Sequence, residues 1–349
     1  MIEAVSDLET LRARVSDWRR GGLRVGFVPT MGNLHAGHRS LVALARQHAD
    51  RVVASVFVNP TQFGPGEDFS RYPRTPDADV TGLDGAGCDL AWLPDVDTMY
   101  PLGIDNAVRI RVPGVTDVLE GAHRPGHFDG VATVVARLFN QVQPDIAVFG
   151  RKDYQQLAVI RHLVADLAFP VELLAAPTLR EADGLAMSSR NQFLDAAARE
   201  KAPELHRVLQ AMRNRILDGE PHDIVEQEAH DRLAAAGFDV DYTVVRAPDL
   251  GEPRRSGPAA TDSASMRASS SAITSGMRRP AERRAWTCSA VARSPSPARR
   301  VGVASPSDIR PPAGGSSRWC GSAGCRGRRT PASACARRLR PRRTGRTRR

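Results

Sequence analysis

The sequence predicts an α/β fold with a parallel sheet flanked by helices, followed by a smaller α+β domain. Apolar runs short enough for buried strands alternate along the first part of the chain with longer segments of helical periodicity. This alternation is typical of βαβ units, which build parallel sheets. Three of the apolar runs end at Val28, Val58 and Phe149, and a polar loop follows each of them. Because ligands bind beyond the carboxyl ends of parallel strands, we expect these loops to meet in one crevice of a Rossmann-like domain.

Each expected strand is a short run dominated by Val, Ile, Leu, Phe and Ala, such as RVVASVFV, and each expected helix carries apolar residues three or four apart. The first helix, for example, has Leu8, Leu11 and Val15 on one side. In chain order the expected elements are helix 7–20, strand 23–28, helix 41–49, strands 51–58, 88–93 and 107–112, helix 131–142, strand 145–149, helix 154–167 and strand 171–175.

The chain divides into three expected parts. Residues 1–180 form a Rossmann-like nucleotide-binding domain. Residues 181–250 form a partial C-terminal lid domain, because a charged helical pattern at 195–236 is followed by one strand at 242–245. In residues 251–349 the apolar periodicity ends, and Arg, Ser, Pro, Ala and Gly dominate. Such a composition cannot bury enough apolar surface to offset its ordering entropy, so we expect a disordered basic tail.

Charge follows the same division. The tail holds 23 arginines, no lysine and four acidic residues, a formal charge of +19, so the first 250 residues carry −9 of the total of +10. One cysteine in those 250 residues, Cys88, argues against a disulfide-built secreted domain and favours a reducing cytosol. The N-terminus lacks the features of a signal peptide, and no run of about 18 apolar residues occurs. We therefore expect a cytoplasmic protein without a membrane partner.

The first polar loop, PTMGNLHAGH at residues 29–38, is a turn between a strand and a helix. Its two glycines allow a tight bend or close approach to a ligand. His35 and His38 are three residues apart at the helix start, so both rings can face the same side. Free N–H groups and a partial positive charge at a helix start suit phosphate. On this motif alone, two surface histidines flanking a tight turn are the favoured interpretation.

The chain has only two lysines, and Lys152 lies in a Gly-x-Lys-Asp turn after an expected strand. There a compact, flexible ammonium can follow moving phosphate charge. Asp153 can hold Mg²⁺ through water or neutralise the lysine. A solvated loop pair is the alternative interpretation.

A second candidate phosphate loop is READGLAMSSRN, in which Ser188, Ser189 and Arg190 supply several hydrogen-bond donors. This loop and the upstream His-x-Gly-His together resemble the two signature loops of class I aminoacyl-tRNA-synthetase-like nucleotidyltransferases. That superfamily binds ATP and attacks its α-phosphate.

Within that superfamily the sequence closely resembles the pantothenate synthetase (pantoate–β-alanine ligase) family. The matching stretches are PTMGNLHAGHRSLV, FVNPTQFGPGEDFSRYPRT, EGAHRPGHFDGV, LFNQVQPDIAVFGRKDYQQLAVIR and READGLAMSSRN. They lie within about residues 20–195, and weaker similarity continues to about residue 250. The resemblance implies an AMP-forming carbon–nitrogen ligase that condenses pantoate with β-alanine through a pantoyl adenylate. It also implies ATP and Mg²⁺ as requirements and a homodimer formed through the N-terminal domain.

The resemblance further assigns residues. Catalytic roles fall to His38, His35, Lys152 and Arg190, and we expect His38 to donate a hydrogen bond to phosphate oxygens in the transition state. The expected ATP-binding residues are Met31, Gly32, Asn33, Leu34, His35, Ala36, Gly37, His38, Gly150, Arg151, Lys152, Asp153, Leu179, Met187, Ser188, Ser189 and Arg190.

Gln62 is expected to bind pantoate and β-alanine, and Gln156 to bind pantoate, because an amide can both donate and accept hydrogen bonds. The other expected substrate residues are Asn59, Val134 and Val135, and Val131 shares their helical spacing. The valines fit an apolar pocket for the gem-dimethyl group of pantoate and equally fit plain helix core. Asp153 is the expected Mg²⁺ residue.

His123 and His127 are spaced like a metal pair, but no cysteine or ordered carboxylate set accompanies them, so we reject zinc. Three functions compete: the ligase, another class I-like nucleotidyltransferase such as an aminoacyl-tRNA synthetase, and a nucleic-acid-binding protein acting through its tail. The Asn-Pro-x-Gln-Phe loop and the lack of an anticodon-type domain argue against the second. The tail has few aromatic residues for base stacking, so we expect no nucleic-acid partner.

The family's small domain continues with antiparallel strands, which the sequence after about residue 250 does not predict. Two explanations are open: out-of-frame reading of GC-rich DNA, which we favour, and a genuine disordered basic arm. The nucleotide sequence around codon 251 decides between them, because a one-base shift must restore strand-like apolar segments if the first is right.

Overall fold

The computed structural model of the chain describes residues 2–253 and 287–293. All of these described residues belong to one compact unit. The expected domain borders near residues 180 and 250 stay predictions. The remainder of the expected tail, residues 254–286 and 294–349, lies outside the described residues.

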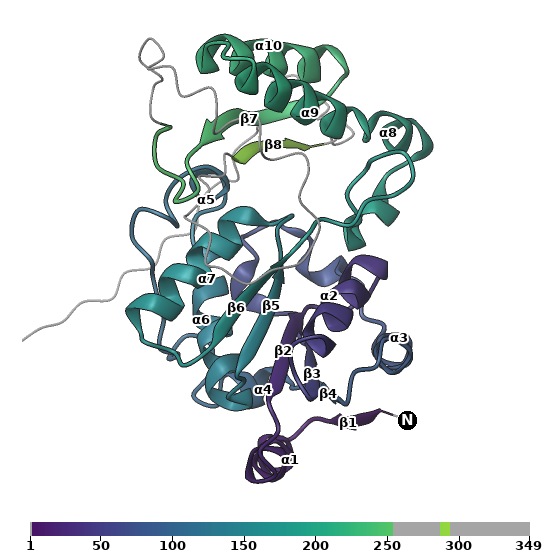
Figure 1. The fold of residues 1–349 in the computed structure, drawn as a ribbon, viewed down its shortest axis with the longest axis vertical. Helices are drawn as coiled ribbons and strands as arrows, with labels where there is room; N and C mark the ends of the chain where they lie inside the picture. The colour runs from purple at the N-terminus through teal and green to yellow at the C-terminus, as the bar shows by residue number, and fades with distance from the viewer. Residues whose placement is uncertain (1, 254–286, 294–349) are drawn as a thin grey trace, which may run out of the picture. The chain divides into compact units, whose positions relative to one another are not determined.

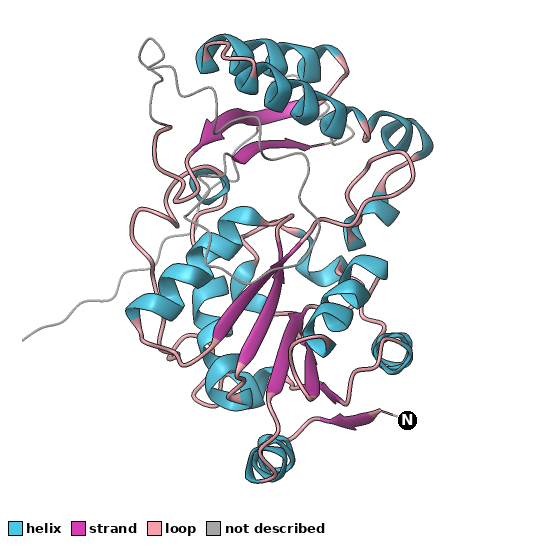
Figure 2. Ribbon diagram, in the orientation of Figure 1, coloured by secondary structure: helices cyan, strands magenta, loops and turns pink. Residues whose placement is uncertain are grey.

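A parallel sheet organises the N-terminal part of this unit (Figures 1 and 2). Its six strands run in the order β1-β4-β3-β2-β5-β6. Their bounds are β1 Glu3–Val5, β2 Val25–Thr30, β3 Arg51–Val56, β4 Leu90–Trp92, β5 Ile146–Gly150 and β6 Glu172–Ala176. The chain moves outward from β2 to β3 and β4 and then returns to β5 on the other side of β2. The boundary between β2 and β5 is therefore the switch point at which open α/β sheets bind ligands.

Helices cover both faces of the sheet, as expected for parallel strands. On one face lie α1 (Leu8–Arg20), α6 (His127–Val142) and α7 (Tyr154–Asp166), and on the other lie α2 (Ala36–Arg46) and α3 (Pro76–Gly85) (Figure 1). Strand β2 contributes side chains to the core on both faces of the sheet. Phe27 packs with Phe139 of α6 in one core cluster, and Val28 packs with Val42 of α2 in the other. The expected α/β fold is confirmed.

Close packing of α2 on the sheet depends on Gly26 in β2. A Cβ atom at this position would lie 3.0 Å from the Cβ of Ala49 and 3.4 Å from that of Ala45. The glycine thus lets the helix that follows the first polar loop lie directly against the strand that precedes it.

Most expected elements are present with shifted ends, and one is wrong. Helix α2 begins at Ala36 rather than residue 41, because the His35 side chain caps it. The predicted strand 107–112 does not form a strand. Val112 is buried and Ile110 packs on the core, which explains its apolar pattern, but the Ile110 N–H donates to Thr133 Oγ1 of α6 rather than to a neighbouring strand. The short β1, α3, α4 (Val96–Met99) and α5 (Glu120–His123) were not predicted.

The C-terminal elements form a separate small layer with its own core. Helices α8 (Ala196–Lys201), α9 (Glu204–Leu217) and α10 (His222–Ala235) precede strand β7 (Asp239–Arg246). Val208 and Met212 of α9 pack there with Leu233 of α10 and Val245 of β7.

Strand β8 (Thr287–Arg293) pairs antiparallel with β7, which corrects the expectation that no further strand follows residue 250. Its sequence TCSAVAR lacks glycine and proline, unlike the segments around it, so its backbone can complete a ladder. Pairing also satisfies backbone groups that β7 would otherwise leave open along that edge.

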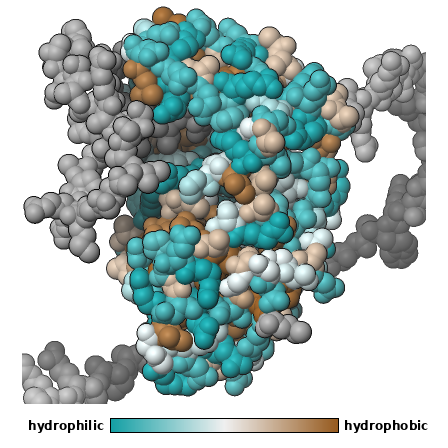
Figure 3. All heavy atoms as spheres, turned by 45° about the vertical axis from the view of Figure 1, so that its right-hand side comes forward, coloured by the Kyte–Doolittle hydropathy of each residue, from teal (hydrophilic) through white to brown (hydrophobic). Residues whose placement is uncertain are grey.

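Figure 3 shows that the described surface on one face is largely hydrophilic, with apolar side chains in small groups. Leu102 and Val108 are the most exposed large apolar residues among those described, each 74% exposed. Every helix in the described ranges is too short or too polar to span a bilayer.

Candidate functional site

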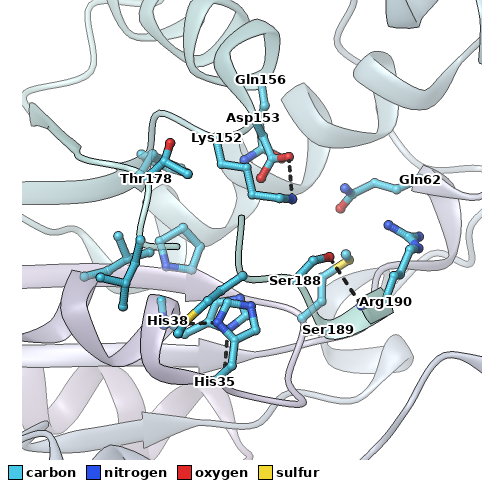
Figure 4. A pocket seen from close by; sticks show the side chains of 18 of the residues that line it. His35, His38, Gln62, Lys152, Asp153, Gln156, Thr178, Ser188, Ser189 and Arg190 are labelled. Atoms are coloured by element: carbon cyan, nitrogen blue, oxygen red, sulfur yellow. Dashed lines mark hydrogen bonds and ion pairs between the residues drawn. The ribbon is translucent and has the colours of Figure 1, made fainter. Parts of the chain in front are cut away.

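An open cleft of about 210 Å³ lies at the carboxyl ends of β2 and β5, where the switch point is. Figure 4 shows side chains from several elements converging on it. The expected site residues that line the cleft are Met31, His35, Gly37, His38, Gln62, Gly150, Lys152, Asp153, Gln156, Leu179, Met187, Ser188, Ser189 and Arg190. The expected meeting of the three polar loops is therefore observed, while the binding role of each residue stays a prediction.

A smaller cavity of about 150 Å³ adjoins the cleft and is lined by the expected valines. Val131, Val134 and Val135 of α6 line it and are also part of the core, so the two interpretations of these residues are compatible. His38, Gln62, Asp153 and Gln156 line both the cleft and this cavity. Pro29, Met31, Tyr72 and Phe149 also line both, so the two spaces share a boundary of mixed polar and apolar side chains.

Some expected ATP residues do not line either cavity: Gly32, Asn33, Leu34, Ala36 and Arg151. They shape the loops instead. The Asn33 carbonyl accepts a hydrogen bond from Ser189 Oγ (3.0 Å), and the Arg151 N–H donates to the Ala176 carbonyl of β6 (2.9 Å). The expected substrate residue Asn59 lies behind Gln62 and is buried.

Asp79 of α3, which the sequence did not single out, holds the first loop from behind. Its carboxylate accepts hydrogen bonds from the backbone N–H groups of Asn33 (3.0 Å) and Leu34 (2.7 Å) and from Thr75 Oγ1 (3.2 Å). Gly32 and Asn33 both have positive φ, +83° and +50°, and a Cβ at Gly32 would lie 2.9 Å from Asp79 Oδ2. Only glycine therefore fits at position 32 while this carboxylate grips the loop.

Backbone donors fix the tautomers of both histidines. Gly37 N–H donates to His35 Nδ1 (3.1 Å), and His35 N–H donates to His38 Nδ1 (3.3 Å), which is a capping box at the start of α2. An N–H group can only donate, so both Nδ1 atoms are acceptors and each neutral ring carries its proton on Nε2. The ring centroids are 4.1 Å apart.

Both histidines are held in the neutral form. Burial, together with the smaller effects of the neighbouring His35 and Lys152, lowers the pKa of His38 to about 3 from an ordinary 6.5. Burial and the Lys152 ammonium also lower the pKa of His35. At neutral pH the loop therefore offers Nε2–H donors without positive charge.

Lys152 and Arg190, two of the cations that line the cleft, each have a carboxylate partner. Lys152 Nζ donates to Asp153 Oδ1 (3.2 Å). Arg190 donates from Nε and Nη2 to the two oxygens of Asp68 (2.9 and 3.1 Å), and its guanidinium lies 5.6 Å from the Tyr72 ring centroid. Hydrogen bonding from Arg190 holds the pKa of Asp68 below its usual value.

A partly buried arginine joins two loops beside Gln62. Arg124 donates to both oxygens of Glu67 (2.9 and 2.6 Å) and to Glu120 (2.8 Å), and His127 Nδ1 lies 2.8 Å from the Gln62 carbonyl oxygen. The Arg124 hydrogen bond lowers the pKa of Glu67.

Sequence reasoning missed several lining residues, namely Tyr72, Glu120, Arg124 and Thr178. The first three lie inside the quoted stretches FVNPTQFGPGEDFSRYPRT and EGAHRPGHFDGV, which were the signal that could have found them. The two histidines with the spacing of a metal pair have different partners: His123 lies 3.5 Å from Asp241, and His127 contacts the backbone of Gln62.

The parallel sheet with its ligand cleft at the switch point, the His-x-Gly-His capping loop and the facing Met-Ser-Ser-Arg loop define an α/β nucleotidyltransferase of the class I aminoacyl-tRNA-synthetase-like superfamily. Residues 3–278 match the family model described as pantoate-beta-alanine ligase. The chain belongs to this family, whose members use ATP to join pantoate and β-alanine into pantothenate, and it is an ATP-dependent carbon–nitrogen ligase.

Curated relatives agree over most of their length. The pantothenate synthetase of Xylella fastidiosa strain M12 is 67% identical over 253 residues, which is 72% of this chain and 90% of the relative. That of Xanthomonas campestris pv. campestris strain B100 is also 67% identical over 253 residues, which is 72% of this chain and 89% of the relative.

Solved structures agree as well. The crystal structure of pantothenate synthetase from Thermus thermophilus is 49% identical, with a TM-score of 0.68, over 73% of this chain and 91% of that one. The pantoate-beta-alanine ligase of Francisella tularensis, complexed with beta-gamma ATP and beta-alanine, is 31% identical, with a TM-score of 0.63, over 71% and 93% of the two chains.

Proposed function

We propose that the cleft joins pantoate to β-alanine in two steps through a pantoyl adenylate. First, a carboxylate oxygen of pantoate attacks the α-phosphorus of ATP, the bond from this phosphorus to the bridging oxygen breaks, and pyrophosphate leaves. Then the β-alanine amine attacks the acyl carbon, the bond to AMP breaks, and the amine loses a proton. The supporting observation is that the cleft lined by the phosphate-type loops and the cavity lined by Val131, Val134 and Val135 share His38, Gln62 and Gln156. The ligand pair of the Francisella tularensis relative is consistent with it.

His38 acts as a neutral hydrogen-bond donor in the first step. Its Nε2–H is free to donate because Nδ1 is occupied by the His35 N–H, and its low pKa keeps the ring uncharged. A donor aimed at phosphate oxygens stabilises the charge that develops as pyrophosphate leaves. His35 donates a second Nε2–H hydrogen bond to the phosphate oxygens from the same face of the start of α2.

Lys152 and Arg190 hold the phosphates of ATP from the other loops. A lysine ammonium has three donors and a guanidinium five, so each keeps donors free beside its carboxylate partner. Ser188 and Ser189 add hydroxyls at the same edge (Figure 4). These groups position rather than react, because adenylation needs alignment and charge stabilisation more than covalent help.

Pantoate lies across the boundary between the two cavities. Its gem-dimethyl group fits the apolar side lined by Val131, Val134 and Val135, while Gln62 and Gln156 bind its polar groups. Gln62 lies close enough to the cleft to bind β-alanine as well.

Mg²⁺ fits the donor set of the cleft. Among the described residues, the cleft and its immediate surroundings hold three cationic side chains, Arg124, Lys152 and Arg190. Each is paired with acidic side chains, which are Glu67, Asp68, Glu120 and Asp153, so no surplus of positive charge remains for ATP. Asp153 would hold the ion through water, as Mg²⁺ commonly uses one carboxylate together with substrate phosphates. When bound, the ion neutralises phosphate charge. Removal of divalent cations with EDTA is expected to abolish pyrophosphate release, with restoration by Mg²⁺.

The protein works as a cytoplasmic homodimer. Leu102 and Val108 are each 74% exposed and flank a stretch of turns and bends outside the sheet, and we infer that these apolar side chains contact a second copy. Sedimentation equilibrium is expected to give twice the chain mass, and Val108→Asp is expected to shift it toward the monomer.

Pyrophosphate release with and without β-alanine tests the two-step order. Enzyme with pantoate, ATP and Mg²⁺ is expected to release about one pyrophosphate per site, and AMP is expected only after β-alanine is added. Strict dependence of pyrophosphate release on β-alanine would overturn the adenylate intermediate.

A further inference from the structure

A buried hydrogen-bond network stands behind Gln62 at the boundary between the two cavities. Asn59 and Tyr100, each 1% exposed, are its centre. Tyr100 OH donates to Asn59 Oδ1 (2.7 Å), and the Thr61 N–H donates to the same atom (3.3 Å). A backbone N–H can only donate, so this end of the Asn59 amide must be its oxygen.

The other end of the Asn59 amide is fixed independently. Asn59 Nδ2 donates to the Gly130 carbonyl oxygen (3.2 Å), which can only accept. Turning the amide over would place two acceptors together at one end and two donors at the other. The orientation of Asn59 is therefore set by two backbone groups, and the Tyr100 hydroxyl holds the oxygen that they place.

Asn59 in turn orients Gln62. The second hydrogen on Asn59 Nδ2 donates to Gln62 Oε1 (3.0 Å), so the Gln62 oxygen faces the protein and its NH₂ group lies at the other end. Gln62 lines both cavities, and among the described residues its Nε2 has no hydrogen-bond partner. The cavities therefore face a donor and not an acceptor.

We propose that Tyr100 and Asn59 are positioning residues that fix the polarity of Gln62, so that Gln62 selects a substrate group that accepts hydrogen bonds, such as a carboxylate. The inference rests on the proposed substrate-binding role of Gln62 and adds the direction of its hydrogen bond. Tyr100 is itself held in place, since the Arg137 guanidinium lies 4.8 Å from its ring centroid. Arg137 Nη1 also donates to the Met99 carbonyl (3.0 Å).

Asn59→Asp is the test, because it replaces the donor that faces Gln62 with an acceptor. Gln62 is then expected to turn its NH₂ toward the new carboxylate at position 59 and its oxygen toward the cavities. We expect KM to rise about tenfold, for pantoate or β-alanine, while KM for ATP stays within about twofold; a tenfold change corresponds to about 1.4 kcal/mol. Separate KM values for the two substrates tell which carboxylate Gln62 binds.

The affinity for pantoamide, the neutral carboxamide of pantoate, gives a second readout that loss of structure would not mimic. If Gln62 inverts in Asn59→Asp, its oxygen can accept from the carboxamide NH₂. The ratio of pantoate to pantoamide affinity, measured by calorimetry, is then expected to fall relative to the unchanged chain.

Tyr100→Phe is the conservative variant, since it removes only the hydroxyl, and we expect a rise of about two- to fivefold in the same KM, which is about 0.4–1 kcal/mol. Thr116→Val is a matched control, because it removes a buried hydroxyl bond to the Val112 carbonyl (2.9 Å) away from both cavities. It is expected to leave all KM values unchanged.

The outcomes separate this inference from the proposed function. If the unchanged chain releases no pyrophosphate from ATP and pantoate, the proposed function fails. If it does, and both variants leave KM for pantoate and β-alanine unchanged, the polarity inference alone is wrong. An equal fall of kcat and rise of every KM, with an unchanged affinity ratio, would also overturn it in favour of a purely structural role.

Discussion

Asp79→Asn is expected to loosen the loop that carries His35 and His38. Asp79 is only 2% exposed, and its two oxygens accept the backbone N–H groups of Asn33 and Leu34 at 3.0 and 2.7 Å. An asparagine keeps one oxygen and sets an NH₂ group against the other N–H. One hydrogen bond to a charged group is lost and a donor is left unpaired, which costs about 1.5–3 kcal/mol. In a domain of this size that lowers the melting temperature by roughly 3–12 °C.

Asp79→Asn is expected to lower the activity as well as the stability. Gly32 and Asn33 have positive φ, a conformation that the carboxylate holds in place, so the loop relaxes when the grip is lost. A misplacement of about 1 Å can cost on the order of a hundredfold in rate, and we expect kcat/KM for ATP to fall at least about tenfold. Pyrophosphate release and thermal unfolding measure the two effects.

Asp77→Asn is the matched control for Asp79→Asn, because Asp77 is an exposed carboxylate in the same first turn of α3. It tests whether loss of negative charge at the helix start accounts for the change. Equal melting temperatures and equal KM values for ATP in the two variants would refute the idea that Asp79 holds the loop.

Three further predictions concern the cleft and the end of the chain. His38→Gln is expected to lower kcat about 10²–10³-fold, as loss of one transition-state donor does, with little change in KM for ATP. Because the pKa of His38 is about 3 in the folded chain and about 6.5 when unperturbed, stability should fall as pH drops from about 6.5 toward 3, and urea unfolding should show a smaller fall in His38→Gln. Asp68→Asn is expected to raise KM for ATP several-fold by freeing Arg190, while stability changes by about 1 kcal/mol or less because the pair is partly exposed; an unchanged KM would show that Asp68 does not orient Arg190. Finally, the chain is expected to be less stable and less active than the Xylella fastidiosa relative, of which about a tenth lies outside the match; equal rates of AMP release and equal melting temperatures would contradict this.

The sheet could be predicted from the sequence because each central strand is buried on both faces and therefore reads as a short apolar run. The same signal failed at residues 107–112. Ile110 and Val112 are apolar because they pack on the core, but strand formation also needs a neighbouring backbone, and Thr133 takes that place. The pattern of apolar residues in a sequence therefore indicates which residues are buried, whereas pairing with a neighbouring strand depends on tertiary structure.

The site was predictable where its residues follow one another in the chain. Lys152 with Asp153 and Ser188 to Arg190 are local motifs, and the ligand-binding edge of a parallel sheet brings them together. Asp79 and Asp68 were missed because they act on groups 46 and 122 residues away, respectively. A carboxylate in a surface-like helix carries no local sign of the backbone or guanidinium that it will hold.

The polar groups of the site share one feature that explains how it can face anions without surplus positive charge. In His35, His38 and Asn59, a backbone N–H occupies the accepting atom of the side chain. A fixed donor at one end leaves only the donating end of each side chain for other partners, and through Asn59 this extends to Gln62. The backbone thus orients neutral side chains, which can both donate and accept hydrogen bonds, so that they present only their donors to the site. Such donors need not be desolvated as ions and do not depend on pH near neutrality, whereas burial would shift the pKa of a lysine or a protonated histidine. An active site assembled this way can follow the movement of negative charge from carboxylate to phosphate without a change in its own protonation.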